Sequence, residues 1–196
     1  MESHSNKNKP HHIYFNQVKK YLTLRNLLIF GLVFILYLMF SNLAKAIIFM
    51  ALFSPLCIIS IKVSRVVPNA NVQLITPLTL LLSYLFGFPV GFIFGTILGL
   101  YFWSTAYSIS QFVLMEVFLN AIVAFLANYI KTNFALNFTI TYFVVMIIQK
   151  ILYFFGGLAI GGNPMENTIH TISSSITHLI IAPSFIFIFF QLATII

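Results

Sequence analysis

Residues 111–130, QFVLMEVFLNAIVAFLANYI, decide the class of fold to which this chain belongs. Glu116 is the one charged residue in the stretch, and a helix of roughly 20 apolar residues crosses a hydrocarbon core of about 30 Å. The whole chain is 60% hydrophobic and 7% charged, whereas a soluble domain carries about 25% charged residues. Most of its surface must therefore face lipid, and we expect a membrane protein.

Further apolar segments lie on both sides of this stretch. The full set lies at residues 26–43, 46–61, 74–86, 90–103, 110–130, 136–155 and 168–192. Polar residues at 41–45 separate the first two segments, and Pro89 predicts a break between the third and fourth because proline lacks a backbone donor. Loops are expected at residues 62–73, which are polar, and at 156–164, which are glycine-rich. The predicted fold is all-α: a polytopic transmembrane helical bundle of six core helices plus an N-terminal apolar helix, multi-pass in the cell membrane.

The charge distribution bears on the partners of the chain. The net charge is +7, and half of the ten Lys and Arg residues lie within the first 25 positions. A basic polar tail ahead of a first span indicates contact with anionic lipid rather than with nucleic acid. We therefore expect a tail at 1–25 and a single transmembrane domain at 26–196. The single cysteine, Cys57, excludes an internal disulfide and a cysteine-based metal cluster.

Four glycines recur at intervals of four residues: Gly87, Gly91, Gly95 and Gly99. This spacing places them on one stripe of a helix, where a second helix can approach closely because no side chains intervene. The stripe predicts packing within the bundle, an interface with a partner subunit, or close approach to a ligand.

Amide side chains gather in the loop before the third segment, at Asn69, Asn71 and Gln73. One interpretation is a turn and helix cap in which the amides satisfy free backbone groups. The other is a polar lip over a substrate cavity.

Ionisable groups within the apolar segments are candidates for function, because a charge at the bilayer centre costs several kcal/mol. Glu116 is the strongest candidate; the alternatives are a glutamate at the membrane interface or one that burial keeps protonated. Gln149 and Lys150, near the end of the sixth segment, are expected to extend to the interface instead.

Glu166, His170 and His178 form an acid–histidine set that spans an arc of about 120° on one helix. The third residue lies two turns beyond the second, farther than a metal site on a single helix allows, so we expect no metal. G-x-S-x-G, H-E-x-x-H and Walker glycine–lysine motifs are missing from the sequence. We therefore expect no enzymatic activity and no cofactor.

Three features together resemble the substrate-binding S components of energy-coupling-factor (ECF) vitamin transporters. They are the loop at 68–78 (PNANVQLITPL), the glycine-spaced helix at 87–99 and the YSISQ sequence at 107–111. The resemblance has pattern content over about 46–130 and implies a core at about 46–192. It also implies a vitamin-like small-molecule substrate, with a transmembrane T subunit and ATPase subunits as partners. The substrate-binding residues would be Asn69, Asn71, Gln73, Tyr107, Gln111, Glu116 and Asn163.

The chain departs from the family pattern in four places. Ala46, Ala51 and Ser54 lack the clean small-residue spacing that the family has on its first helix for docking the T subunit. The segment at 26–43 is additional, the proline expected before the glutamine is missing, and the expected tryptophan is Tyr107 unless Trp103 replaces it. With seven full spans, the positive-inside rule places Lys62 and Arg65 in the cytoplasm, whereas the resemblance places them outside. If 26–43 lies in the interface, six spans agree with the family, and the two basic residues could attract an anionic substrate.

Two other functions are compatible with the sequence. A non-catalytic membrane scaffold or assembly protein would use the glycine stripe as a partner interface. An intramembrane enzyme would use Glu116 or the set Glu166, His170 and His178.

Overall fold

The computed structural model describes residues 26, 28–29, 31–32, 41–66, 73–105 and 109–195. The chain divides into two units, Met1–Ala44 and Lys45–Ile196, and the fold and the site described below belong to the second. The described residues form helices and short connections, with no strand among them. The predicted apolar segment at 26–43 lies mostly outside the described residues.

Four of the described helices are long and apolar enough to cross a membrane, which indicates a membrane protein. They are α3 (Ser41–Val66), α7 (Gln111–Phe134), α8 (Phe138–Ala159) and the continuous helix Pro164–Ile195. The last comprises α9 (Pro164–Ile176), the π-helical turn η2 (Thr177–Ile181) and α10 (Ala182–Ile195). The shorter elements are α4 (Ile75–Phe86), α5 (Phe88–Phe92), the π-helical η1 (Ile93–Leu98) and α6 (Gly99–Ser104).

Several predicted boundaries are wrong, because helices continue through residues that we assigned to polar or glycine-rich loops. Residues 41–45 and 62–66 belong to α3, where the Ser64 hydroxyl donates to the Ser60 carbonyl within the helix (2.9 Å). Gly156 and Gly157 lie in α8. Pro183 does not break the last helix, because the π-helical turn η2 precedes it and supplies the wider turn that a missing backbone donor requires.

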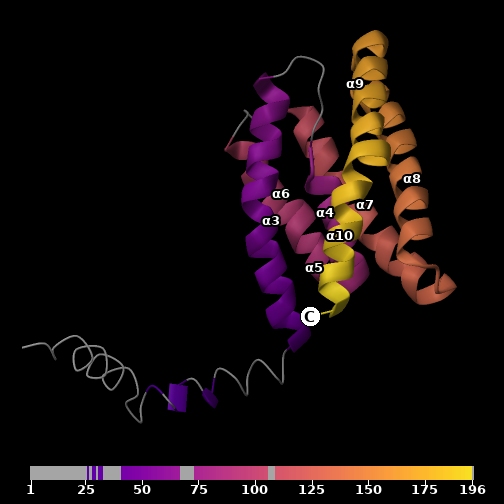
Figure 1. Ribbon diagram of the computed structural model, residues 1–196. Coiled ribbons are helices and arrows are strands. Elements are labelled where there is room, and N and C mark those ends of the chain that lie inside the picture. The colour runs from indigo at the N-terminus through magenta and orange to yellow at the C-terminus, as the bar shows by residue number, and fades with distance from the viewer. Residues whose placement is uncertain are drawn as a thin grey trace, which may run out of the picture. The chain divides into compact units, whose positions relative to one another are not determined.

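The short helix α4 lies at the centre of the bundle. Its residues from Ile75 to Ser83 are all buried, and it packs against α5, α7, α8, α10 and η1. Twelve residues of helix extend only about 18 Å, less than the hydrocarbon core. Protein rather than lipid therefore surrounds α4. Figure 1 shows α3 on one side of the bundle and α8 and α9 on the other.

Hydrogen bonds from polar side chains fasten α4 to its neighbours. The Thr76 hydroxyl donates to Asn120 Oδ1 on α7 (2.8 Å), and Asn120 Nδ2 donates to the Gly95 carbonyl in η1 (3.3 Å). The Ser83 hydroxyl donates to the Ala124 carbonyl (2.5 Å). Because lipid offers no partner to polar groups, such internal bonds are required at membrane depth.

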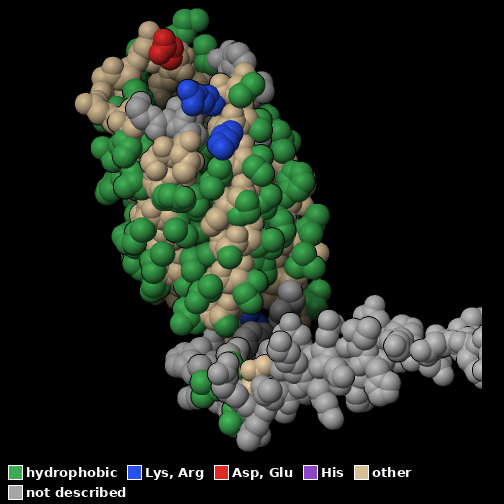
Figure 2. Space-filling model, turned by 90° about the vertical axis from the view of Figure 1, so that its left-hand side faces the viewer, with side chains coloured by type: hydrophobic (Ala, Val, Ile, Leu, Met, Phe, Trp, Pro, Cys, Tyr) green, Lys and Arg blue, Asp and Glu red, His purple; other side chains and the backbone are tan. Residues whose placement is uncertain are grey.

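The outer surface is apolar over the length of the helices. On the face shown in Figure 2, hydrophobic side chains cover the body, and the charged side chains lie toward its two ends, most of them at one end. Large exposed hydrophobic residues occur on α3, α7, α8 and α10, for example Ile48, Phe118, Ile147 and Phe185. This distribution suits a lipid environment.

Three of the four glycines of the predicted stripe face the interior of the chain. The fourth, Gly87, is half-buried and ends α4 at a φ of 95°, so its place on the same helix was predicted wrongly. Gly91, Gly95 and Gly99 are buried. A Cβ atom at Gly91 would lie 2.4 Å from Ser83 Cβ, and one at Gly95 would lie 2.7 Å from the Thr79 side chain. The absence of side chains at these two positions therefore allows α5 and η1 to approach α4. Because the three glycines are buried within the chain, they do not form an exposed surface for a partner helix.

We predict that Gly91→Ala destabilises the protein by about 1–3 kcal/mol, because the new methyl group would overlap the Ser83 side chain and backbone. Gly99→Ala is the matched control, since its Cβ would make only ordinary contacts, at 3.6 and 3.7 Å. That variant should stay within roughly 1 kcal/mol of the wild type. Thermal unfolding of the purified protein in detergent measures both, and equal losses would contradict the assignment of Gly91 to the α4 contact.

Candidate ligand-binding site

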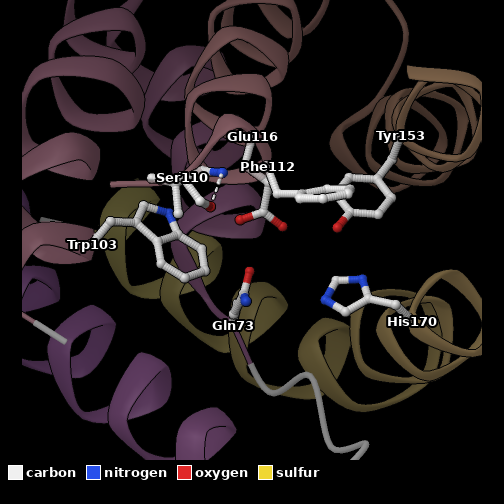
Figure 3. Close-up of a pocket in the computed structure, with 8 residues that line it drawn as sticks. Gln73, Trp103, Ser110, Phe112, Glu116, Tyr153 and His170 are labelled. Carbon is white, nitrogen blue, oxygen red and sulfur yellow. Dashed lines mark hydrogen bonds between the residues drawn. The ribbon is translucent and has the colours of Figure 1, made fainter. Parts of the chain in front are cut away.

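A cavity of about 340 Å³ lies among α6, α7, α8, α9 and the segment before α4. We call it the Glu116 cavity. Figure 3 shows the Glu116 carboxyl group and the Gln73 side chain pointing toward one another, with Trp103 on one side and Tyr153 and His170 on the other. Its lining residues are Gln73, Trp103, Ser110, Phe112, Val113, Glu116, Tyr153 and His170.

Two neighbouring helices hold Gln73 in position. On one side, the Leu74 backbone N–H donates to the Ser60 hydroxyl of α3 (3.2 Å). On the other, His178 Nε2 donates to the Gln73 carbonyl (2.7 Å), and the Tyr142 hydroxyl donates to the His178 carbonyl (2.7 Å). The backbone at Gln73 is thus fixed between α3 and η2, which directs the buried amide side chain toward the cavity.

The start of α7 places Glu116 at the cavity. Ser110 caps this helix, and its hydroxyl accepts a hydrogen bond from the Val113 N–H (3.4 Å), a common way to satisfy a free donor in the first turn. Phe112, Val113 and Glu116 recur at helical spacing, so they share one face of α7. All three line the cavity.

Close packing of α8 against α9 brings the aromatic wall together. Gly157 lies against the Asn167 side chain, so close that a Cβ atom would be 2.5 Å from Asn167 Oδ1. Asn167 Nδ2 donates to the Phe154 carbonyl (2.7 Å). One helical turn farther into the bundle, the rings of Tyr153 and His170 stack, with centroids 5.1 Å apart and planes at 17°.

Gln149 is buried, with 4% of its surface exposed, so the prediction that it extends to the membrane interface is wrong. The same prediction is wrong for Lys150, which lies inside the bundle. Only 7% of its surface is exposed, and its amino group donates to the Ser174 hydroxyl on α9. The positive charge of its amino group attracts the Glu116 carboxylate and opposes a positive charge on His170 or His178. The polar partners available within the bundle explain why it does not need to reach water.

A second cavity of about 280 Å³ adjoins the first and shares Phe112, Tyr153 and His170 with it. We call it the Glu166 cavity. Its other lining residues are Gly162, Asn163, Glu166 and Asn167, from the turn between α8 and α9 and the first turns of α9. Asn163 also caps α9, because its Oδ1 accepts a hydrogen bond from the Met165 N–H (2.9 Å).

Some of the substrate-binding residues predicted from the sequence line a cavity, one does not, and three lie outside the described residues. Gln73 and Glu116 line the first cavity, and Asn163 lines the second. Gln111 is exposed at the start of α7 and is not among the lining residues of either cavity. Three candidates lie outside the described residues: Asn69, Asn71 and Tyr107.

Other lining residues were not assigned as substrate-binding residues from the sequence. The sequence indicates Trp103 only as a replacement for Tyr107, and it does not single out Phe112 or Tyr153. A signal for Tyr153 was present: Gln149, Lys150 and Tyr153 follow helical spacing, and all three are buried on α8. Such a polar face within an apolar helix indicates an interior site.

Glu166, His170 and His178 do not form one site. Glu166 and His170 line the second cavity, whereas His178 is buried and donates to the Gln73 carbonyl. Within the described part of the chain, no group of three or more His, Cys, Asp or Glu side chains is arranged to hold a metal ion.

Comparisons with protein-family models, with curated proteins and with solved structures return no match for this chain.

We predict that the Glu116 carboxyl group and the Lys150 amino group stabilise one another. Lys150→Gln and Glu116→Gln should each destabilise the protein, and the double variant should lose less than the sum, by roughly 0.5–3 kcal/mol. Thermal unfolding of the four proteins measures this coupling. Glu116→Gln combined with Lys131→Gln is the control and should be additive, since fifteen residues of helix separate these two side chains by about 22 Å. Additive losses for the first pair would contradict the coupling.

Proposed function

We propose that this chain is a substrate-binding membrane subunit, similar to the S components of ECF uptake transporters. It would capture a vitamin-like small molecule and pass it to a T subunit and its ATPases. The observation that supports this function best is the Glu116 cavity, a partly polar hollow between helices whose outer surfaces are apolar.

The size and lining of the cavity suit a small organic molecule. Ligand sites commonly measure about 300–1,000 Å³ and combine aromatic walls with a few polar groups. This cavity measures about 340 Å³ and has Trp103, Phe112 and Tyr153 as aromatic walls, with Glu116 and Gln73 as polar groups. Aromatic faces can hold a flat ring, while the carboxyl and amide groups can fix its orientation.

The order of the helices is compatible with six spans of the cell membrane. These would be the four long helices α3, α7, α8 and α9–η2–α10, together with two shorter ones, the α5–η1–α6 helix and α4. Alone, α4 is too short to cross the hydrocarbon core and would lie within the bundle. The segment before α4, the start of α7 and the turn before α9 all contribute to the two cavities, so the cavities lie at one end of the bundle. A binding site near one membrane surface is what capture from one side requires.

Energy for uptake would come from partner subunits. The sequence contains no nucleotide-binding motif of the Walker type, so the proposed mechanism assigns ATP hydrolysis to separate ATPases. The scaffold alternative is not favoured, because Gly91, Gly95 and Gly99, which would form the partner interface, are buried against the chain's own helices.

This function predicts a small molecule bound to the purified protein, detectable by mass spectrometry after denaturation. Phe112→Ala should reduce the amount retained, since Phe112 lines both cavities. Phe118→Ala is the matched control: both phenylalanines lie on α7, with 39% and 65% of their surfaces exposed, but Phe118 lines neither cavity. A wild-type protein that retains no molecule and binds no vitamin-like compound would rule out the proposal.

A further inference from the structure

The acidic residues of this chain are few, and two of them line the adjoining cavities. The sequence contains three acidic residues in all, Glu2, Glu116 and Glu166. Glu116 lines one cavity and Glu166 the other. Resting on the proposed function, we infer that the bound molecule is an organic cation with a flat ring, long enough to contact both carboxyl groups.

The two cavities have a wall of aromatic side chains in common, and this shared wall connects the cavity of one carboxyl group with that of the other. Phe112, Tyr153 and His170 line both cavities, so a molecule that occupies both must pass these three rings. Aromatic faces attract organic cations through the negative charge of the π system, and they also hold flat rings by stacking. The wall therefore suits the middle of such a molecule, and each carboxylate suits a positively charged nitrogen at one end.

Each end of the site also offers hydrogen-bond acceptors to a protonated nitrogen. The Gln73 side chain faces Glu116 in the first cavity, and Asn163 and Asn167 accompany Glu166 in the second. A metal ion fits this arrangement poorly, because Ca²⁺ and Mg²⁺ require six or more closely placed oxygen ligands. Among the described residues, no cluster of three metal-binding side chains occurs.

The Lys and Arg side chains of the described part do not line the cavities, whereas His170 lines both. Lys150 interacts electrostatically with Glu116 and so opposes a cation there, but its amino group is directed to the Ser174 hydroxyl and is not part of either lining. Coulomb energy falls with distance. A cation inside the cavity therefore interacts more strongly with the Glu116 carboxylate, which lines the cavity, than with the Lys150 amino group, which does not. Lys62 and Arg65, near the end of α3, are likewise not part of either lining.

Glu166 has a second effect that the test must separate from ligand binding. It lies in the first turn of α9, where a negative charge stabilises the helix dipole. Glu166→Asp keeps this charge but shortens the side chain, whereas Glu166→Gln removes the charge. If Glu166 only stabilises α9, Glu166→Asp should behave like the wild type and only Glu166→Gln should change. If Glu166 contacts the ligand, both variants should bind it more weakly, because the aspartate side chain is shorter.

The test uses the purified full chain and four probes of one ring size. They are the dication 1,4-bis(aminomethyl)benzene, the monocation benzylamine, the neutral 1,4-benzenedimethanol and the dianion terephthalate. Trp103 is the single tryptophan of the chain and lines the first cavity, so its fluorescence reports occupancy directly. Calorimetry provides an independent Kd. We expect the dication to bind most tightly, benzylamine less tightly, and the diol and terephthalate least.

Removing a carboxylate from the protein should weaken binding, as removing a positive charge from the probe does. Glu116→Gln and Glu166→Gln should each raise the Kd for the dication roughly tenfold or more, since each removes a charge-assisted hydrogen bond. Arg65→Gln is the control and should leave that Kd unchanged. Equal or tighter binding of the diol or terephthalate, an unchanged Kd in both glutamate variants, or binding of none of the probes would overturn the inference.

The molecule that co-purifies with the protein separates this inference from the proposed function. A retained cation with a ring supports both. A retained neutral or anionic molecule overturns the cation inference and leaves the binding function standing. A protein that retains nothing and binds no probe or vitamin-like compound overturns both.

Discussion

Asn120 connects three helices, and the position of the candidate site depends on it. Its amide accepts a hydrogen bond from Thr76 of α4 and donates one to the Gly95 carbonyl of η1. In lipid there is no hydrophobic force between helices, so close packing and internal hydrogen bonds determine which faces meet. Glu116 precedes Asn120 by one helical turn, on the same face of α7. The bond that directs Asn120 inward therefore also directs Glu116 inward.

The class of fold could be predicted from the sequence because hydropathy measures a property that acts over a whole segment. Residues 111–130 are apolar enough to cross a bilayer wherever they lie, and α7 covers them. Segment ends were less predictable. Ser, Asn and Gly favour loops in water, but here Gly157 allows α8 to contact Asn167 on α9, and this packing keeps the helix continuous.

The candidate site was predictable only in part, because its members come from distant segments. Gln73 and Glu116 were identified from amide content and from an isolated charge, properties that each residue carries locally. The burial of Lys150 was not foreseen, because it depends on Ser174 of another helix. The fixed position of Gln73 likewise depends on His178, 105 residues later in the chain. Spacing within one helix shows a polar face but not the element that covers it.

The π-helical segment η1 affects the residues that follow it. A π turn accommodates one more residue than an α turn, and each residue of a helix advances by about 100° around the axis. The extra residue in η1 therefore sets the rotational phase of α6, where Trp103 is buried and lines the Glu116 cavity. In a regular α-helix of the same length, position 103 would face about 100° away. A single-residue insertion or deletion in η1 would thus turn Trp103 away from the cavity and present a neighbouring position of α6 in its place, although Trp103 itself would be unchanged.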